Sequence, residues 1–199
     1  MISLIVDPLI IYPEGDEFFS PDERFPEYSF GTIATRRNDV YRAVRNCFAQ
    51  AGMDAIHLGT PAWNPLGESI NPGNKVFVLC NFAGERRPNE KIEDFQSRCT
   101  HGSVIRAVID YILLAVGKNG SVMFGNAPVQ YTHWEEVLMD TGADKVRDFY
   151  KTQNMPVEAC DLRLMVTNTT QMGVIKNVEF RPENLAVHVN LDSDSLLFE

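Results

Sequence analysis

His101 is the residue of this chain best suited to acid–base chemistry, and it follows Cys99 and Thr100 at the predicted start of a helix. The positive end of a helix dipole disfavours an imidazolium and favours a neutral ring, which can accept a hydrogen bond or bind a metal. Cys99 and His101 make a Cys-x-His pair, but a structural metal site needs four ligands. Three interpretations of His101 stay open: an ordinary residue of the helix start, a ligand contact or a metal ligand.

A second candidate region begins at Gly125, after the apolar run at residues 121–124, and leads into a predicted helix. A strand that ends in a glycine turn and feeds a helix is where an open α/β sheet usually binds its ligand. Free backbone N–H groups near the helix start would suit a phosphate or a carboxylate. Asn126 and Gln130 are neutral, so they suit recognition of a polar ligand better than proton transfer.

No complete catalytic or nucleotide-binding motif accompanies these residues. The chain contains neither Gly-x-Gly-x-x-Gly nor Gly-Lys-Thr/Ser, so a known dinucleotide or P-loop site is not predicted. It also lacks Gly-x-Ser-x-Gly, and no other histidine has a sequence neighbour that suggests a catalytic triad. Asp161 and Arg163 flank Leu162 at a strand end, where they either pair with each other or present one side chain to the ligand cleft.

Strands and helices alternate along the part of the chain that carries these residues. Residues 75–82 form a nearly continuous apolar run, which is typical of a central strand covered on both faces. Helical spacing, capping residues and turns define the remaining elements. In chain order we expect helix 38–51 capped by Asn38 and ended by Gly52, strand 55–58, strand 75–82, helix 100–116 capped by Thr100, strand 121–124, helix 134–140 capped by Thr132 and Glu135, helix 144–154, strand 157–162, and a hairpin of 174–180 with 185–191.

This order of elements implies parallel strands joined by right-handed crossovers. We predict an α/β fold, a three-layer sandwich with a mostly parallel sheet and a C-terminal antiparallel hairpin. Arg106 and Asp110, four residues apart, are expected to pair on the helix side opposite its apolar face. The ligand cleft would lie at the carboxyl ends of the parallel strands. The residues expected to line it or lie beside it are Asn81, Thr100, His101, Gly125, Asn126, Gln130 and Arg163.

The N-terminal region differs in composition from the rest of the chain. Residues 12–36, called the arm below, are rich in proline, acidic and aromatic residues and follow neither a helical nor a strand period. The many aromatics predict that the arm packs on the domain or on a partner chain. We therefore divide the chain into residues 1–36, an N-terminal strand with the arm, and a single α/β domain over residues 37–199.

Composition limits the expected environment and partners. The 199-residue chain is 44% hydrophobic and has a formal net charge of -9 spread over its length, so nucleic acid is not an expected partner. No stretch reaches the roughly 20 apolar residues of a membrane helix, and the first apolar residues lack the basic leader of a secretory signal. The four cysteines are widely spaced, with no Cys-x-x-Cys pair. These features predict a cytoplasmic protein with reduced thiols, no membrane partner and no metal site.

Several motifs, in order along the chain, are similar to those of one known family. They are Ser-Pro-Asp-Glu-Arg-Phe-Pro-Glu-Tyr at 20–28, Gly-Thr-Pro-Ala-Trp-Asn-Pro-Leu-Gly at 59–67, Thr-His at 100–101, Gly-Asn-Ala-Pro at 125–128 and Val-Glu-Ala-Cys-Asp-Leu-Arg at 157–163. In this order they resemble the proteins catalogued as domain of unknown function 362 (DUF362). The resemblance covers most of the chain, from the arm to about Arg163.

Three departures from the family pattern bear on activity. Where the family commonly has Lys-Pro-Asn, this chain has Leu-Cys-Asn ending at Asn81; Asn126 replaces the acid of Gly-Asp-Ala-Pro, and Gly102 replaces the proline of Thr-His-Pro. These changes remove a lysine and an acid beside the expected cleft. The resemblance also implies a continuation beyond Glu199, into a second half that carries a lysine- and histidine-bearing motif. Some members carry an added ferredoxin-like cluster region that this sequence lacks.

Members of the family occur in cell-surface glycan contexts. The resemblance therefore implies an enzyme, or half of one, that acts on a small anionic metabolite such as a sugar phosphate in glycan assembly. His101 would be its general base or a ligand contact, and the Gly125 turn its anion cradle, while the cofactor is left undefined. The alternative is a non-catalytic binding or assembly module, which docks on a partner chain or on a second copy through the arm.

Overall fold

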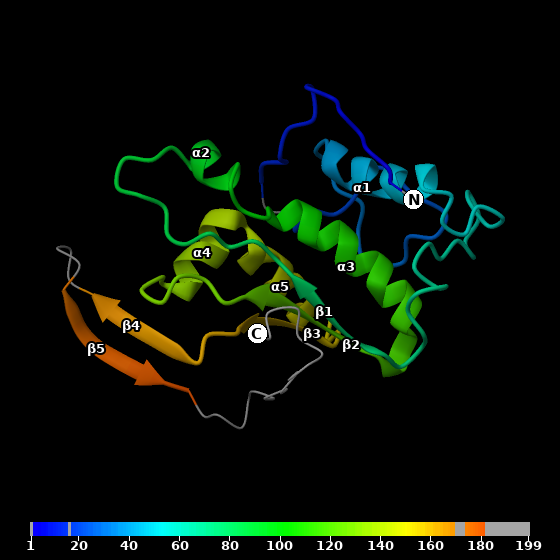
Figure 1. The fold of residues 1–199 in the computed structure, drawn as a ribbon. Helices are drawn as coiled ribbons and strands as arrows, with labels where there is room; N and C mark the ends of the chain where they lie inside the picture. The colour runs from blue at the N-terminus through cyan, green and yellow to red at the C-terminus, as the bar shows by residue number, and fades with distance from the viewer. Residues whose placement is uncertain (1, 16, 170–173, 182–199) are drawn as a thin grey trace, which may run out of the picture.

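A parallel sheet forms the centre of the computed structural model, which describes residues 2–15, 17–169 and 174–181 (Figure 1). Its strands, within these residues, are β1 (Lys75–Leu79), β2 (Ser121–Asn126) and β3 (Val157–Asp161), which pair in the order β1-β2-β3. Val122 and Phe124 of the central strand β2 are buried. The predicted parallel strands are confirmed, and the strand expected at 121–124 extends to Asn126.

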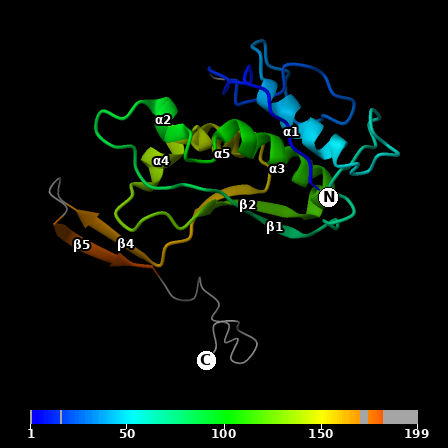
Figure 2. The same cartoon turned by 45° about the horizontal axis from the view of Figure 1, so that its top comes forward.

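Helices cover one face of this sheet. They are α1 (Asp39–Gln50), α2 (Ile92–Gln96), α3 (Gly102–Val116), the short 3-10 helix η1 (Gly117–Asn119), α4 (Trp134–Thr141) and α5 (Ala143–Thr152). α3 packs on β1 and β2, α5 packs on β3, and α1 packs on α3. Figure 2 shows α1, α3 and α5 on the same side of β1 and β2. None of the described helices is both long and apolar enough to cross a lipid bilayer.

The other face of the sheet is open among the described residues. Phe77 and Leu79 of β1 and Met123 of β2 lie on this face, and Leu79 is 73% exposed. β1 alternates between exposed and half-buried residues, whereas the sequence predicts a strand covered on both faces. The α/β class is confirmed, but the second helical layer of a three-layer sandwich is not seen in the described part of the chain. An apolar run does not reveal that its strand lies at a sheet edge, as β1 does.

An antiparallel hairpin follows β3, as the sequence predicts, and it contains the strand predicted at residues 174–180, but the strand paired with it is a different one. β4 (Met165–Thr169) pairs with β5 (Ile175–Phe180), and Met165 lies opposite Phe180. The sequence instead predicts pairing of residues 174–180 with 185–191, and the latter lie outside the described residues. The reason is that alternation of apolar and polar side chains marks a strand without identifying the strand it pairs with.

Capping signals locate α1 correctly and α3 within one residue. The Asn38 side chain accepts a hydrogen bond from the Tyr41 backbone N–H (3.2 Å), and Gly52, with φ of 70°, follows the last turn of α1. The predicted cap of α3 at Thr100 is wrong, because His101 is the N-cap and its side chain accepts from the Ser103 N–H.

Two other local predictions are wrong. The Thr132–Glu135 capping box does not form, because His133 is the N-cap residue of α4 and Glu135 pairs with Arg147 at 2.8 Å. The strand expected at residues 55–58 is a series of turns, since these residues lie on the surface with no sheet edge beside them in the described chain. Short apolar runs of this length do not distinguish a strand from a turn.

The arm packs on the domain. Phe19 and Phe30 are buried in the core between the helices and the sheet, and Phe25 joins a second buried cluster with Tyr41 and Trp63. Aromatic rings bury large areas, so these three side chains contribute strongly to the packing of an irregular segment against the domain. The predicted intramolecular packing of the arm is confirmed.

A buried ion pair ties the arm to α3. Arg106 donates from Nε to the carboxylate of Asp110 (3.0 and 3.1 Å) and from its terminal nitrogens to the carbonyls of Phe18 and Phe30 (2.9 and 3.0 Å). Asp110 also accepts from the Tyr150 hydroxyl at 2.6 Å. Burial opposes the charge of Arg106, but the Asp110 carboxylate raises its pKa. The predicted pair is confirmed, but it is buried because the arm covers this side of α3.

Candidate functional site

The predicted cleft residues at the carboxyl end of β1 join the sheet to α3. The Asn81 N–H donates to the Thr100 hydroxyl, and the Thr100 N–H donates to the Asn81 carbonyl, both at 2.8 Å. The Asn81 side chain donates to the Arg98 carbonyl at 3.0 Å. The structure therefore brings Asn81 and Thr100 together, and their bonds hold the chain at the start of α3.

Gly125 lies inside β2 and not in a turn. It pairs with Leu79 on one side and Cys160 on the other, and its carbonyl accepts from the Cys80 N–H at 2.8 Å. A Cβ at this position would lie 1.8 Å from the Cys160 carbonyl oxygen, so only glycine permits the close approach of β2 and β3. The predicted glycine turn is therefore wrong. The chain has glycine at this position because the backbones of β2 and β3 pack too closely for a side chain. Asn126 ends β2 with its side chain accepting from the Ala127 N–H.

Arg163 organises the loop that follows β2. Its Nη1 donates to the carbonyls of Val129, Gln130 and Thr132 at 3.1, 2.9 and 2.8 Å, while Nε and Nη2 bind the Asp161 carboxylate at 2.6 to 3.2 Å. The predicted pairing of Asp161 with Arg163 is confirmed. Burial opposes the charge of Asp161, but the hydrogen bonds from Arg163 lower its pKa. Gln130 contributes its carbonyl to this arrangement, and a ligand contact of Gln130 or Arg163 stays a prediction.

His101 lies in an aromatic environment at the start of α3. Its ring stacks on Tyr12 with centroids 4.0 Å apart and meets the edge of Phe19 at 5.3 Å. The Nδ1 atom accepts from the Ser103 N–H at 3.2 Å and lies 2.8 Å from the Ser103 hydroxyl. An accepting Nδ1 assigns the proton of the neutral ring to Nε2. His101 is buried, with 4% of the residue's surface exposed.

The protonation state of His101 follows from this environment. Burial, with the nearby charge of Lys145, lowers the pKa of His101 to about 4. The imidazole is therefore neutral at neutral pH, as the sequence predicts, but the main cause is desolvation and not the helix dipole alone. A base with so low a pKa is a weak proton acceptor at pH 7, because general bases act best with a pKa near the working pH.

A cavity of about 950 Å³ lies beside His101. Residues of the N-terminal segment, α1, α2, the start of α3 and the α4–α5 region form its walls. Most of the wall is apolar, with Ile10, Val44 and Val104 among the lining residues. Gln96, His101 and Lys145 contribute polar groups, and Glu14 and Glu93 contribute acids. This volume is within the range of pockets that hold small molecules.

Of the seven predicted cleft residues, His101 is the one that lines this cavity. The other six predicted cleft residues do not line it: Asn81, Thr100, Gly125, Asn126, Gln130 and Arg163. The sequence places all seven in one cleft because they follow adjacent parallel strands. The side chain of His101 instead points toward the arm, which supplies Tyr12 and Phe19. The many aromatic residues of the arm were the feature of the sequence that could have indicated the contacts of His101 with Tyr12 and Phe19.

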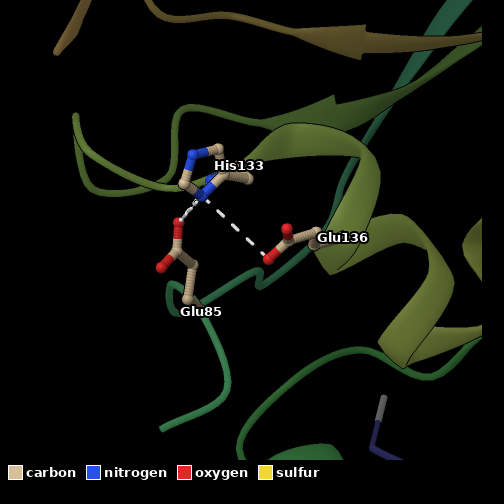
Figure 3. A group of neighbouring side chains, drawn as sticks. All are labelled: Glu85, His133 and Glu136. Atoms are coloured by element: carbon tan, nitrogen blue, oxygen red, sulfur yellow. Dashed lines mark hydrogen bonds and ion pairs between the residues drawn. The ribbon is translucent and has the colours of Figure 1, made fainter. Parts of the chain in front are cut away.

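A second group of polar side chains lies beyond the carboxyl end of β1. Glu85, His133 and Glu136 each offer one atom that could bind a metal, and these atoms lie within 4.8 Å of one another (Figure 3). His133 Nδ1 is 2.6 Å from a Glu85 oxygen and 4.0 Å from a Glu136 oxygen. The sequence predicts no metal site and misses this group. The His-x-x-Glu spacing at a helix start was the available signal, but nothing local brings Glu85 to it.

Searches of protein-family models, curated proteins and solved structures found no match to this chain. The resemblance to DUF362 therefore rests on the sequence motifs alone and stays a prediction. The geometry of the chain itself is the basis for the functional proposals that follow.

Proposed function

We propose that this chain binds a small, mainly apolar molecule in the cavity beside His101, with a hydrogen-bond acceptor of the ligand meeting the imidazole. The observation that carries the proposal is a neutral, buried imidazole with its proton on Nε2 in the wall of a mostly apolar cavity of about 950 Å³. Small-molecule sites typically combine apolar walls with a few polar groups that orient the ligand.

Recognition is a better-supported role for His101 than proton transfer. Its pKa of about 4 makes it a weak base at neutral pH. Its Nδ1 atom is already occupied by Ser103, which leaves the Nε2 proton as the group available to a ligand. The enzyme implied by the DUF362 resemblance would use the same cavity for its substrate, but the hydroxyl that His101 contacts, that of Ser103, is at the Nδ1 side of the ring and does not line the cavity.

The charges around the cavity favour an uncharged acceptor, such as a carbonyl, over a sugar phosphate. Glu14 and Glu93 line the cavity and would repel a phosphate dianion. Lys145, which also lines it, donates to the Gly15 carbonyl at 2.9 Å. The proposed ligand therefore differs from the anionic metabolite that the resemblance implies.

The alternative role, docking on a partner through the arm, has weaker support. Phe19, Phe25 and Phe30 are in the core of the same chain, so a partner could bind them only if the arm left the domain. The N-terminal residues before the arm are different, because Ile2 and Val6 are 96% and 82% exposed. An assembly surface would therefore use residues 2–11, and deleting them would change the oligomeric state measured by light scattering while leaving residues 12–36 in place.

The test of ligand binding uses the full chain and the dye Nile red, an uncharged apolar molecule with a carbonyl acceptor. We expect its fluorescence to rise to saturation at one site per chain. His101→Phe, which keeps an aromatic ring but has no donor, should weaken binding by roughly 5- to 10-fold, the value of one lost hydrogen bond. His57→Phe is the matched control, because His57 is exposed and does not line the cavity. It should bind like the unmodified chain.

A cavity-filling variant gives a second test. Ala43 of α1 lines the cavity, so Ala43→Trp should abolish dye binding, whereas Ala51→Trp at the end of the same helix should not. Circular dichroism identifies any variant that fails to fold. Binding that never saturates, or that persists unchanged in both His101→Phe and Ala43→Trp, would refute the proposed function.

A further inference from the structure

A histidine and two glutamates face one another beyond the carboxyl end of β1, and we propose that they bind a divalent transition-metal cation. Glu85 lies in the loop after β1, His133 precedes the first turn of α4, and Glu136 lies in that turn (Figure 3). None of these three described residues lines the cavity beside His101. The metal proposal is therefore independent of the proposed function.

The donor atoms are brought together by contacts between distant parts of the chain. A Glu85 oxygen accepts from the His133 backbone N–H at 2.6 Å and lies 2.6 Å from Nδ1 of the same residue. His133 and Glu136 are three residues apart, so they share one face of α4. The imidazole consequently lies between the two carboxylates, at 2.6 Å from one and 4.0 Å from the other.

The backbone on both sides of the site is held by arginine side chains. Arg98 donates to the Glu85 carbonyl at 3.0 Å. Arg163, which is buried, donates to the carbonyl of Thr132, the residue before His133, at 2.8 Å. Metal sites bind better when the surrounding structure fixes the backbone of their ligands, because less ordering is then needed on binding.

The spacing of the donors agrees with a metal ion after small side-chain rotations. Zinc lies about 2.0–2.2 Å from nitrogen and carboxylate ligands, which puts neighbouring ligand atoms about 3–3.5 Å apart. The two distances from His133 Nδ1, 2.6 and 4.0 Å, lie on either side of this value. Both His133 and Glu136 are more than half exposed, so their side chains have room to adjust. Three protein ligands would leave at least one position for water.

Charge also favours a cation at this place. The two carboxylates carry negative charge that a divalent ion bound beside the imidazole would balance. Two arginines close to these ligands in the sequence are paired with other acids: Arg86 binds Asp140 at 3.2 Å and Arg147 binds Glu135 at 2.8 Å. One imidazole with two carboxylates suits ions such as Zn²⁺ and Mn²⁺ better than ions that prefer thiolates, and the imidazole disfavours Mg²⁺ and Ca²⁺.

The test titrates Mn²⁺ and Zn²⁺ into the full chain, without an affinity tag and after treatment with a chelator. Calorimetry measures Zn²⁺, and electron paramagnetic resonance counts bound Mn²⁺, which does not favour the cysteines. We expect one saturable site per chain. His133→Gln, Glu85→Gln and Glu136→Gln should each weaken binding at least 10-fold, the range expected for the loss of a metal ligand.

Glu135→Gln is the matched control, because Glu135 lies in the same turn but pairs with Arg147. It should bind both ions like the unmodified chain, and the circular dichroism spectra of all four variants should be unchanged. Absence of saturable binding of either ion would overturn the proposal. Binding that is equally strong in the His133→Gln, Glu136→Gln and Glu135→Gln variants would also overturn it, because the ion would then be held by the acidic surface in general.

Discussion

Acidification should destabilise this protein through His101, and the size of the effect can be worked out from its environment. The unfolded chain takes up a proton at the usual histidine pKa of 6.5, whereas burial lowers the pKa of folded His101 to about 4. Because the folded pKa is the lower one, the unfolded state binds more protons between these values. The stability contribution of a neutral His101 is therefore complete above pH 6.5 and is lost as the pH falls toward 4.

The expected loss between pH 7.5 and 5 is about 2 kcal/mol. At pH 5 an unfolded histidine is almost fully protonated, while folded His101 is mostly neutral, and the ratio of the two binding polynomials is roughly 30. The limiting loss at lower pH is about 3 kcal/mol, since each unit of pKa difference corresponds to about 1.4 kcal/mol. Tyr12 and Phe19 keep water from the ring and so cause the desolvation.

The assay is urea unfolding followed by tryptophan fluorescence, with buried Trp63 as one reporter, at the two pH values. Other groups titrate over the same range, so the quantity to compare is the pH-dependent change in the free energy of unfolding. This change should be about 2 kcal/mol smaller in His101→Gln than in the unmodified chain. His57→Gln is the control, because His57 is exposed and pairs with Asp54 at the surface, so it should alter the change much less than His101→Gln does.

A pH-dependent change that is the same in His101→Gln and in the unmodified chain would refute this reasoning. It would mean that His101 is protonated as readily in the folded state as in the unfolded state, so that its burial by the arm is not maintained in solution. The same result would weaken the ligand proposal, because that proposal requires the imidazole of His101 to be buried and neutral in the cavity wall.

Two further changes test the packing that supports both sites. Arg106→Met should lower the free energy of unfolding by about 3–5 kcal/mol, because it leaves Asp110 buried without its cation, and limited proteolysis should then cut within the arm. Arg42→Met, which removes a half-buried arginine that pairs with the same arm, should cost about 1 kcal/mol or less. Gly125→Ala should lower the melting temperature several times more than a substitution at an exposed position does, since the added Cβ would overlap the Cys160 carbonyl. A melting temperature equal to that of the unmodified chain would contradict the close approach of β2 and β3.

Local signals in the sequence determined α1, the body of α3 and the three parallel strands. Asn38 and Gly52 limit α1 because capping and a left-handed residue act within a few positions of the helix end. The strands around Val76, Phe124 and Val157 follow from short apolar runs between helices, and their parallel order follows from the helices that join them. The neutral state of His101 was also predictable, although burial contributes more than the helix dipole.

Only the tertiary structure decided what surrounds these elements. Apolar runs do not state which sheet face is covered, so the open face of β1 and the pairing of β4 with β5 were not predictable. The sequence places His101 in the same cleft as Gly125, but the arm folds over the start of α3 and gives His101 a separate cavity. Glu85 reaches His133 through a contact across 48 positions of the chain. Such contacts depend on how whole elements pack, and short-range spacing carries no record of that packing.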